Sequence, residues 1–455
     1  MRKNSLYLLI GFLLVSCAFT SCLDSDGTNY DLTSDAIISA FSIGTIETKV
    51  PGKTSAGKDT TFVYTVDGSL YPFTIDQLSN EIYNKDSLPL GTDVSRVVTS
   101  ITTSYAYALT YLKNGKDTVW TSTDSIDFRE PVSFKAYALN GAYRQYQIKI
   151  NVHQVDPDSL YWNKVDGNFA LPAESRQKAV YSNGVMYVFV DSGDGALKVT
   201  SSSDGQLWSG LQPISLQKAD YTSILSIEDK LYMLADKKMY VSANGVDWNL
   251  TNETLYDKMF AASVATRQLF TLIGDDICAV DLDNYAVQTL NKKNEFFPDE
   301  SLTYSTTHLN TAGNIERLTL VGVRAASSDT TAVVWTKLST EKAWTYYPQA
   351  SNNNSGCPRL ANLTTIAYDN GLYAFGGAND YATSKGIPAF EYMYKSVDGG
   401  IGWIPQTNKV MLPAEFKGRD PYYSYLIDDN HYLWIFWADG SNEVWKGRIG
   451  HLGFN

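Results

Sequence analysis

The chain has 455 residues, of which 44% are apolar and 13% aromatic, enough to bury one large core or two moderate ones. Its formal net charge of −12 argues against a nucleic-acid partner, because binding a phosphate backbone needs a concentrated positive field. The 31 tyrosines, 10 tryptophans and 32 glycines, with only 19% charged residues, favour β-structure over long helices. We therefore expect a two-domain, all-β protein that binds no nucleic acid.

Residues 1–22 predict a secretory signal of the lipoprotein type. Two basic residues precede an apolar run, 6–15, that is too short for a membrane-spanning helix. The signal ends in small residues and a cysteine, which indicates lipid attachment at Cys22 or, alternatively, at Cys17. We prefer Cys22, because the polar and acidic residues 23–35 that follow it would form a flexible tether. An N-terminal lipid would anchor the protein in an outer membrane.

Two acidic residues, Asp24 and Asp26, lie close to the expected lipid. They resemble the acidic export signal of Bacteroidetes surface lipoproteins. The resemblance implies exposure on the outer face of the outer membrane; a periplasm-facing anchor is the alternative.

From 36 to 155 the sequence alternates apolar and polar residues in short runs bounded by Gly, Asn, Asp or Pro. Such period-two runs predict antiparallel strands, about seven of them. This number of strands in a domain of this size favours an immunoglobulin-like β-sandwich. The segment shows neither a histidine cluster nor paired carboxylates at a plausible spacing, so we expect it to act as a spacer.

From residue 156 onward the chain repeats one pattern, in which polar turn residues precede a short apolar run. Six copies occur, at 183–191, 228–236, 266–275, 314–323, 369–377 and 429–440. We interpret each as a hairpin turn feeding a buried inner strand, and the repeat predicts a six-bladed β-propeller over 156–455. The last unit supplies only three strands, so the segment 159–165 is predicted to close the ring as its fourth.

A second element, which ends in tryptophan, recurs downstream of several apolar runs. Residues 396–403 read SVDGGIGW, and SSDGQLW and SANGVDW are one residue shorter. Serine and aspartate side chains can accept hydrogen bonds from the N–H groups of a tight turn, glycine permits positive φ, and tryptophan packs between blades. We therefore expect a structural role for ten positions: Ser202, Asp204, Trp208, Ser242, Asn244, Trp248, Ser396, Asp398, Gly400 and Trp403.

The octet at 396–403 matches the Asp-box pattern of sialidase-like propellers, and LYAFGG at 372–377 resembles a kelch strand. The whole mature chain resembles uncharacterised Bacteroidetes lipoproteins that join an immunoglobulin-like domain to a kelch or Asp-box propeller. This resemblance implies an all-β fold, a sandwich followed by a six-bladed propeller, and no particular activity. In propellers with Asp-boxes, these turns lie on the face opposite the usual ligand entrance.

Patterns for catalysis are weak. Arg324, Arg359 and Arg419 could supply a sialidase-like arginine trio, but the arginine motif of the first sialidase blade is absent. The four histidines are scattered, so we expect no metal site, and we expect no cofactor. No G-x-S-x-G elbow, phosphate loop or specific carboxylate pair stands out. A carbohydrate-active enzyme, a glycoside hydrolase or lyase, is therefore the second interpretation.

Two cysteines remain in the body of the mature chain, Cys278 and Cys357. In an oxidising compartment they could pair, and they could equally be two buried free thiols. The sequence leaves both possibilities open.

Long propeller loops at 292–305, 348–360, 378–392 and 405–423 are predicted to surround the mouth of the ring. Long loops on a rigid ring are where binding residues usually lie, and aromatic rings with a few charged donors suit sugars or proteins. The candidate binding residues are Tyr304, Arg324, Arg359, Tyr381, Arg419, Tyr422, Tyr423 and Trp437. We expect a monomer that binds a glycan or a protein without catalysis; a scaffold in an outer-membrane assembly is the third interpretation.

Overall fold

The computed structural model describes residues 33–53, 58–191, 193, 196–309, 315–325, 329–348, 355–379, 382–383 and 386–453. The predicted signal peptide 1–22 with Cys22, most of the tether 23–35, and Tyr381 lie outside these residues. The chain divides into two compact units, Met1–Gln154 and Val155–Asn455. Among the described residues, no helix has the length and apolar content needed to cross a membrane.

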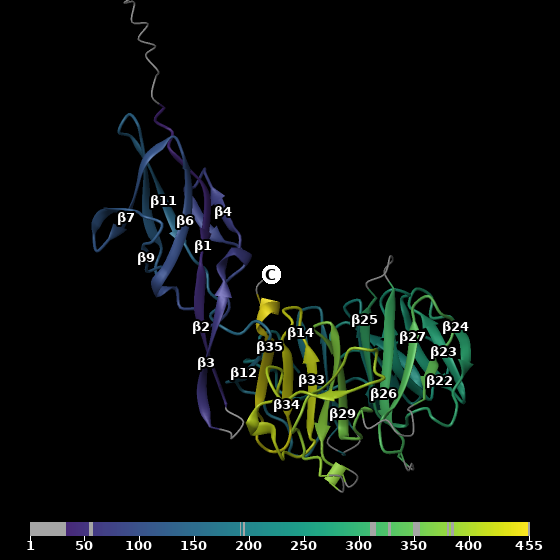
Figure 1. The fold of residues 1–455 in the computed structure, drawn as a ribbon. Helices are drawn as coiled ribbons and strands as arrows, with labels where there is room; N and C mark the ends of the chain where they lie inside the picture. The colour runs from purple at the N-terminus through teal and green to yellow at the C-terminus, as the bar shows by residue number, and fades with distance from the viewer. Residues whose placement is uncertain are drawn as a thin grey trace, which may run out of the picture. The chain divides into compact units, whose positions relative to one another are not determined.

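The N-terminal unit contains eleven strands in its described part, arranged in three sheets (Figure 1). The strands are β1 (Ile37–Ile43), β2 (Thr45–Lys53), β3 (Asp59–Asp67), β4 (Phe73–Asp76), β5 (Glu81–Asn84), β6 (Val97–Ser104), β7 (Ala106–Lys113), β8 (Lys116–Val119), β9 (Ser125–Ile126), β10 (Val132–Ala138) and β11 (Tyr143–Lys149). The sheet orders are β1-β6-β9, β4-β5-β11-β10-β7-β8 and β2-β3.

The core of this unit lies between the three-stranded and the six-stranded sheets. Phe41 and Val97 contribute from the first sheet, and Phe134 and Tyr146 from the second. On β10 the residues alternate strictly between buried and half-buried, as expected for a sheet with one face on a core. The other face of the six-stranded sheet is therefore available to solvent.

The sequence underestimated the number of strands in this unit. Short strands such as β8 and β9 carry too few residues for a period-two signal, and β2 and β3 form a two-stranded sheet of their own. The pairing also includes one parallel pair, β5 with β11. Both features depend on long-range pairing that local alternation does not report.

The C-terminal unit contains six four-stranded antiparallel sheets in its described part. The first three are β13 (Arg176–Ser182), β14 (Val185–Asp191), β15 (Leu197–Ser202) and β16 (Gln212–Pro213); β17 (Ala219–Ile227), β18 (Lys230–Ala235), β19 (Lys238–Ser242) and β20 (Asn249–Leu250); and β21 (Lys258–Ser263), β22 (Gln268–Ile273), β23 (Asp276–Asp281) and β24 (Val287–Lys292).

The other three sheets follow in chain order, and the last includes a strand from the start of the unit. They are β25 (Glu300–His308), β26 (Glu316–Val323), β27 (Val333–Leu338) and β28 (Thr345–Tyr347); β29 (Ala361–Tyr368), β30 (Gly371–Gly377), β31 (Tyr394–Ser396) and β32 (Ile404–Pro405); and β12 (Leu160–Val165), β35 (Val444–Ile449), β34 (Leu433–Trp437) and β33 (Tyr423–Ile427). β12 pairs with β35 over its whole length, from Leu160 opposite Ile449 to Val165 opposite Val444.

The innermost strand is the first in chain order in five of these sheets and β33 in the last sheet, where β12 is outermost. We call these six strands the first strands, and they contact one another in a ring. β13 contacts both β33 and β17, and the series continues through β21, β25 and β29. The Tyr423 hydroxyl of β33 lies 2.7 Å from the Thr364 hydroxyl of β29, which joins the last pair. Sheets arranged in such a ring form a β-propeller, an architecture in which the innermost strands surround a central channel.

One prediction about the blades was wrong. The repeated apolar runs, interpreted as inner strands, are the second strands, for example β14 and β18. Second strands are sandwiched between neighbouring sheets, so both of their faces are buried and their sequences are continuously apolar. The innermost strands border the channel and carry mixed sequences.

Because neighbouring strands are antiparallel, each connection between strands lies at one of the two ends of the ring. Connections that precede the first strands and those between second and third strands open at one end, which we call the loop end. Connections between third and fourth strands, which carry the tryptophan turns, lie at the opposite end, the turn end. The long loops therefore share one end, as expected from the sequence.

Candidate functional site at the channel mouth

The three tryptophan turns at the turn end use their polar atoms internally. The Ser202 hydroxyl accepts a hydrogen bond from Gly205 N (2.9 Å), and Asp204 Oδ1 accepts from the N–H groups two and three residues later (2.8 and 2.9 Å). The buried Trp208 indole donates to Gly205 O (3.0 Å). The same contacts recur, with small shifts in spacing, at Ser242, Asn244 and Trp248 and at Ser396, Asp398, Gly400 and Trp403.

Two of the predicted binding residues are core residues instead. Tyr423 is 2% exposed, and its hydroxyl donates to Asn362 O (2.8 Å). Trp437 is fully buried at the end of β34, among Phe416, Phe390 and Tyr423. Both were expected in or beside an accessible loop. Tyr423 is instead buried on β33, and Trp437 lies on β34, a second strand whose residues are all buried between neighbouring sheets.

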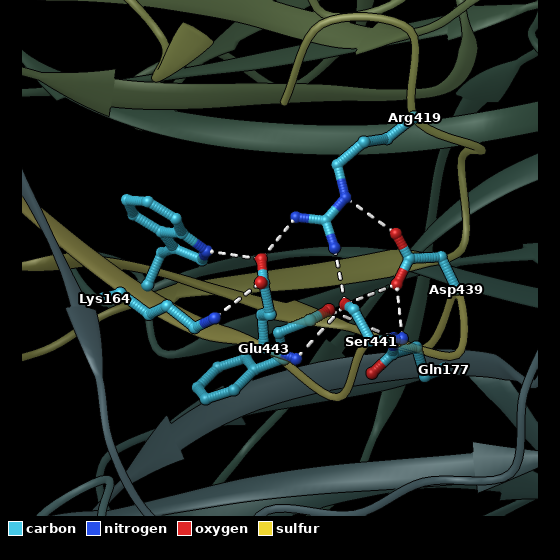
Figure 2. A network of polar contacts seen from close by, with 8 residues as sticks. Lys164, Gln177, Arg419, Asp439, Ser441 and Glu443 are labelled. Atoms are coloured by element: carbon cyan, nitrogen blue, oxygen red, sulfur yellow. Dashed lines mark hydrogen bonds and ion pairs between the residues drawn. The ribbon is translucent and has the colours of Figure 1, made fainter. Parts of the chain in front are cut away.

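Arg419 lies in the long 405–423 loop, but its side chain is 12% exposed and fully engaged (Figure 2). Its guanidinium donates to Asp439 (2.7 Å) and to Glu443 (2.8 Å), and also bonds Ser441. The group stacks over the Trp437 ring at 4.0 Å from the centroid. These contacts fix the loop to the β34–β35 connection and leave little of the guanidinium for a ligand.

The two carboxylates of this network stay ionised. Burial raises the pKa of Glu443, but hydrogen bonds from Lys164, Trp445 and Arg419 outweigh burial and hold that pKa at about 2. Burial likewise raises the pKa of Asp439, while Arg419 and Ser441 bring it below its ordinary value. A carboxyl held this low makes a poor general acid at neutral pH. The pair is therefore structural rather than an acid–base pair.

Arg324 and Arg359 form a second loop-end network. Arg324 binds Asp329 through Nε and Nη2 (2.6 and 2.5 Å) and lies 4.8 Å from the Phe296 ring. Arg359 donates to the backbone carbonyl of Arg324 (2.9 Å). The contacts join three loops, and each arginine is held by protein groups, so a convergent sialidase-like trio with Arg419 does not form from these contacts. Tyr422 is half-buried and packs beside a neighbouring core cluster.

A cluster that the sequence did not single out lies on three adjacent innermost strands. Lys178 is on β13, Asp220 on β17 and Lys258 on β21, each within the first three residues of its strand and hence near the loop end. All three residues are half-buried. We call this group the mouth cluster, because it borders the channel where the channel opens at the loop end.

The mouth cluster places two cations around one carboxylate. Lys178 Nζ donates to Thr222 O (2.7 Å) and Lys258 Nζ to Asp299 O (3.0 Å). Burial lowers the pKa of Lys178 to about 8 and also lowers the pKa of Lys258, while the charge of Asp220 opposes both shifts. Asp220 Oδ1 itself accepts from the N–H and hydroxyl of Thr222 (2.9 and 2.6 Å).

Hydroxyl groups line the innermost strands on the other side of the ring. Thr303 and Thr365 bond through their hydroxyls (2.7 Å), and the Tyr425 hydroxyl donates to Thr365 O (3.2 Å). Tyr304, a predicted binding residue, lies on β25 among them, half-buried, and burial raises its pKa to about 12. At neutral pH its hydroxyl is therefore protonated and can donate or accept a hydrogen bond.

The structure answers the question that the sequence left open about the two cysteines. Cys278 and Cys357 are both free and buried, and burial raises the pKa of each thiol. Across the described ranges, no group of three or more His, Cys, Asp and Glu side chains is arranged to hold a metal ion.

Fold and site together define a class: an all-β protein whose C-terminal unit is a β-propeller. Residues 156–455 match the family described as the DUF6242 beta propeller domain, and residues 41–150 match the DUF6242 N-terminal domain, a domain of unknown function. The chain belongs to the DUF6242 family.

Solved structures resemble the chain only in part. The BP39L lectin from Burkholderia pseudomallei is 12% identical, with 71% of this chain and 93% of that one covered, at a TM-score of 0.35. The α-L-arabinofuranosidase Arb93A from Fusarium graminearum is 10% identical, with 64% and 97% covered, also at 0.35. Regucalcin from Agrobacterium tumefaciens is 7% identical, with 63% and 94% covered, at 0.37. A search of curated proteins finds no match.

Proposed function

We propose that this protein is a non-catalytic binding protein of the outer cell surface, whose propeller takes a carboxylate-bearing glycan at the channel mouth. The observation that carries the proposal is the pair of half-buried ammonium groups, Lys178 and Lys258, on innermost strands. An ammonium group can donate three hydrogen bonds. Among the described residues, Lys178 and Lys258 each donate one, to a backbone carbonyl. A ligand carboxylate at the mouth would offset the cost of burying both charges.

A glycan fits this mouth better than a protein does. The groups beyond the mouth cluster include the hydroxyls of the half-buried residues Thr303, Tyr304 and Tyr425, which suit the many hydroxyls of a sugar. A protein partner would need a broader apolar centre, and the aromatic residues expected to supply one, Tyr423 and Trp437, are buried. A protein ligand therefore becomes the less favoured form of the binding function.

The remaining parts of the proposal concern architecture and place. The six sheets support a six-bladed propeller, and the internal hydrogen bonds of the tryptophan turns support a structural Asp-box role. The N-terminal unit, with its core between a three-stranded and a six-stranded sheet, serves as an immunoglobulin-like spacer. The sequence of residues 1–35 supports lipid attachment at Cys22, with surface exposure as the favoured orientation and a monomer as the expected state.

A lyase is the second candidate function, because one observation favours it. Lys178 has a pKa of about 8, within the range in which an amine can act as a base near neutral pH. In a lyase this amine would take the proton from the carbon next to a uronate carboxylate while Lys258 neutralised that carboxylate. The electron pair left on the carbon would form a double bond and expel the glycosidic oxygen, which would accept a proton from the Lys178 ammonium. The hydrolase alternative is less favoured, because Asp439 and Glu443 are ionised partners of Arg419.

The test uses the chain without its predicted signal, residues 23–455, in affinity electrophoresis with polygalacturonate, alginate and hyaluronan, and with dextran as a neutral control. We expect retardation by at least one acidic polysaccharide and a loss of affinity of about tenfold or more when Lys178 and Lys258 are both replaced by Met. Lys230→Met, at an exposed position of the turn end, is the matched control.

Three outcomes separate the candidates. Unchanged affinity in the double variant, or no retardation by any acidic polysaccharide, contradicts the proposal, and silence throughout favours the scaffold role. Unsaturated sugar products, detected by their ultraviolet absorbance and abolished by Lys178→Met, would favour the lyase.

A further inference from the structure

The solvent face of the six-stranded sheet carries a strip of three tyrosines. Tyr107, Tyr137 and Tyr143 lie on the adjacent strands β7, β10 and β11. Their ring centroids are 6.4 Å apart between Tyr107 and Tyr137 and 5.4 Å apart between Tyr137 and Tyr143. Tyr107 is 61% exposed and Tyr143 is 53% exposed. The rings therefore form one continuous aromatic strip across three strands.

The strip is not an extension of the hydrophobic core. On β10, Phe134, Ala136 and Ala138 point inward and are buried, whereas Ser133, Lys135 and Tyr137 alternate with them on the other face. Single exposed aromatics are common on protein surfaces, but three rings that contact one another in series across one sheet face are not explained by chance exposure.

Polar groups lie beside the strip in register. Lys135 pairs with Asp117 of β8 (2.7 Å) and lies over the Tyr143 ring at 5.1 Å, so its charge is neutralised. Opposite Lys135 on β11 is Gln145, and opposite Ser133 is Gln147, both exposed. The face thus offers amide and hydroxyl groups next to aromatic rings without a net charge at its centre.

The same face continues into an open depression of about 630 Å³. Leu112, Ser133 and Gln147 contribute to its lining, together with Asp127, Arg129 and Glu130, of which Asp127 and Arg129 form an ion pair. Ser133 and Gln147 belong to both the depression and the polar row beside the tyrosines, so the two features are contiguous. A ligand could therefore extend along β10 and β11 from the rings to the depression.

We propose that this face is a second binding site, for a neutral polysaccharide chain. Tyrosine rings offer flat apolar surfaces with a polar edge, which match the alternation of C–H and hydroxyl faces on a pyranose ring. Neighbouring amides and hydroxyls supply the directional hydrogen bonds that fix such a ligand. A charged polymer would gain nothing at Lys135, which Asp117 already neutralises. The site is independent of the mouth cluster and of the acidic ligand proposed there.

The test is affinity electrophoresis of the 23–455 chain in gels containing xyloglucan, galactomannan or amylopectin. We expect at least one of these neutral polysaccharides to retard the protein, and the double variant Tyr107→Ala/Tyr143→Ala to lose about tenfold or more in affinity. Tyr143→Phe keeps the ring and should stay within about threefold of the wild type. Tyr64→Ala, which removes a ring 55% exposed on β3, is the matched control and should bind normally.

Several results overturn the proposal. These are the absence of retardation by all three polysaccharides, full affinity in the double variant, or equal losses in Tyr143→Phe and Tyr143→Ala. Loss of neutral-polysaccharide binding in Lys178→Met/Lys258→Met, with no effect of the tyrosine changes, assigns the binding to the propeller and also overturns it. If the double variant melts below the wild type, the single variant Tyr107→Ala, at the most exposed ring of the strip, provides the comparison.

Discussion

Burial of the Lys178 ammonium lowers the stability of the folded chain, and the same group is proposed to bind the ligand. Its ammonium is partly withdrawn from water at the channel mouth, where it donates to one carbonyl, Thr222 O, and is stabilised by the charge of Asp220. Functional sites often retain such costs because the group is needed in the bound state. The mouth cluster should therefore show opposite effects on stability and on ligand affinity.

Replacing Lys178 by Met should stabilise the folded chain at neutral pH. Folding lowers the pKa of this lysine from 10.5 to about 8, so below 8 it is charged in both states and folding bears the full desolvation cost. Between the two values the unfolded chain holds a proton that the folded chain has released, so wild-type stability rises with pH. We expect Lys178→Met to add on the order of 1 to 3 kcal/mol at pH 7, and the gain to shrink above pH 8.

Urea unfolding at neutral pH and at a pH between the two pKa values measures this difference. Lys230→Met, at an exposed position, should change stability by less than about 0.5 kcal/mol at either pH. A gain for Lys178→Met that does not vary with pH would contradict the explanation by charge.

Asp204 shows how one carboxylate organises a turn. Hydrogen bonds from Leu207 N and Gln206 N lower its pKa, and Asn244 makes the equivalent contacts in the next turn without a charge. Asp204→Asn should therefore be close to neutral, whereas Asp204→Ala leaves two N–H groups without their acceptor and should lower the melting temperature by about 2 to 4 °C.

The acid response of the Asp204 variants distinguishes the hydrogen bonds from the charge. A carboxyl with a lowered pKa contributes stability above its ordinary pKa and loses that contribution as pH falls through the lowered value. Wild type should lose this contribution on acidification, and Asp204→Asn should not. Thermal melts at neutral and acidic pH give the comparison, and parallel curves for the two proteins would refute it.

At the scale of elements, Arg419 connects three separate parts of the last blade. Its loop, the β34–β35 connection with Asp439 and Glu443, and β12 through Lys164 meet in one network (Figure 2). Because the side chains of Arg419, Asp439 and Glu443 are mostly buried, these three charges depend on one another for solvation. The network therefore controls whether the long loop and the closing strand stay in place.

Arg419→Ala should destabilise the propeller by about 3 to 5 kcal/mol, because it removes the guanidinium from two mostly buried carboxylates and leaves Asp439 without its cationic partner. Arg419→Lys keeps the charge but not the forked geometry, and should fall between Ala and wild type. Chemical denaturation at neutral pH measures both. Equal stability of all three proteins would show that the loop is held by packing alone.

The same network predicts acid sensitivity. The pKa of Glu443 is lowered to about 2, so its contribution is complete above its ordinary value near 4.5 and is lost as pH falls toward 2. The wild type should therefore lose more stability than Arg419→Ala over that interval.

The elements differ in how far the sequence revealed them. Second strands and tryptophan turns repeat because every copy has the same surroundings, and this allowed the propeller to be predicted. The innermost strands border a channel whose lining changes around the ring, so Lys178, Asp220 and Lys258 follow no repeat. Tyr423 and Trp437 were predicted to be accessible but are buried. The local sequence of an aromatic residue near a loop does not show whether its side chain points toward solvent or toward the core.

A signal for the mouth cluster did exist in the sequence. Each charged residue stands near the start of the strand that precedes the turn and apolar run marking the second strand. Reading the run as the second strand rather than the first would have brought these positions to the channel. The tyrosine strip needed cross-strand pairing between β7, β10 and β11, which local patterns do not specify.

At the scale of the whole propeller, stability depends on joining the first strand to the last. β12 and β35 are separated by nearly the whole unit in sequence, yet they pair along six residues each. Trp162 fastens β12 by donating to Met411 O (2.8 Å) and by packing against Phe416. Hydrogen bonding between β12 and β35 closes the ring. If these two strands separated, the ring would open at this sheet while the other five sheets kept their strand pairing.

Gly447 is the position where this closure can be tested. It lies opposite Trp162, and a Cβ atom there would sit 2.6 Å from the indole ring, too close for any side chain. Gly447→Ala must therefore displace Trp162 or the closing strand, and should destabilise the propeller by about 1 to 3 kcal/mol. In a Trp162→Ala background the obstacle is gone, so the same substitution should cost much less. The free energies of unfolding of wild type, the two single variants and the double variant complete the double-mutant cycle. Additive changes would mean that the two residues do not meet across β12 and β35. Strong coupling would mean that the stability of the whole ring depends on this single contact.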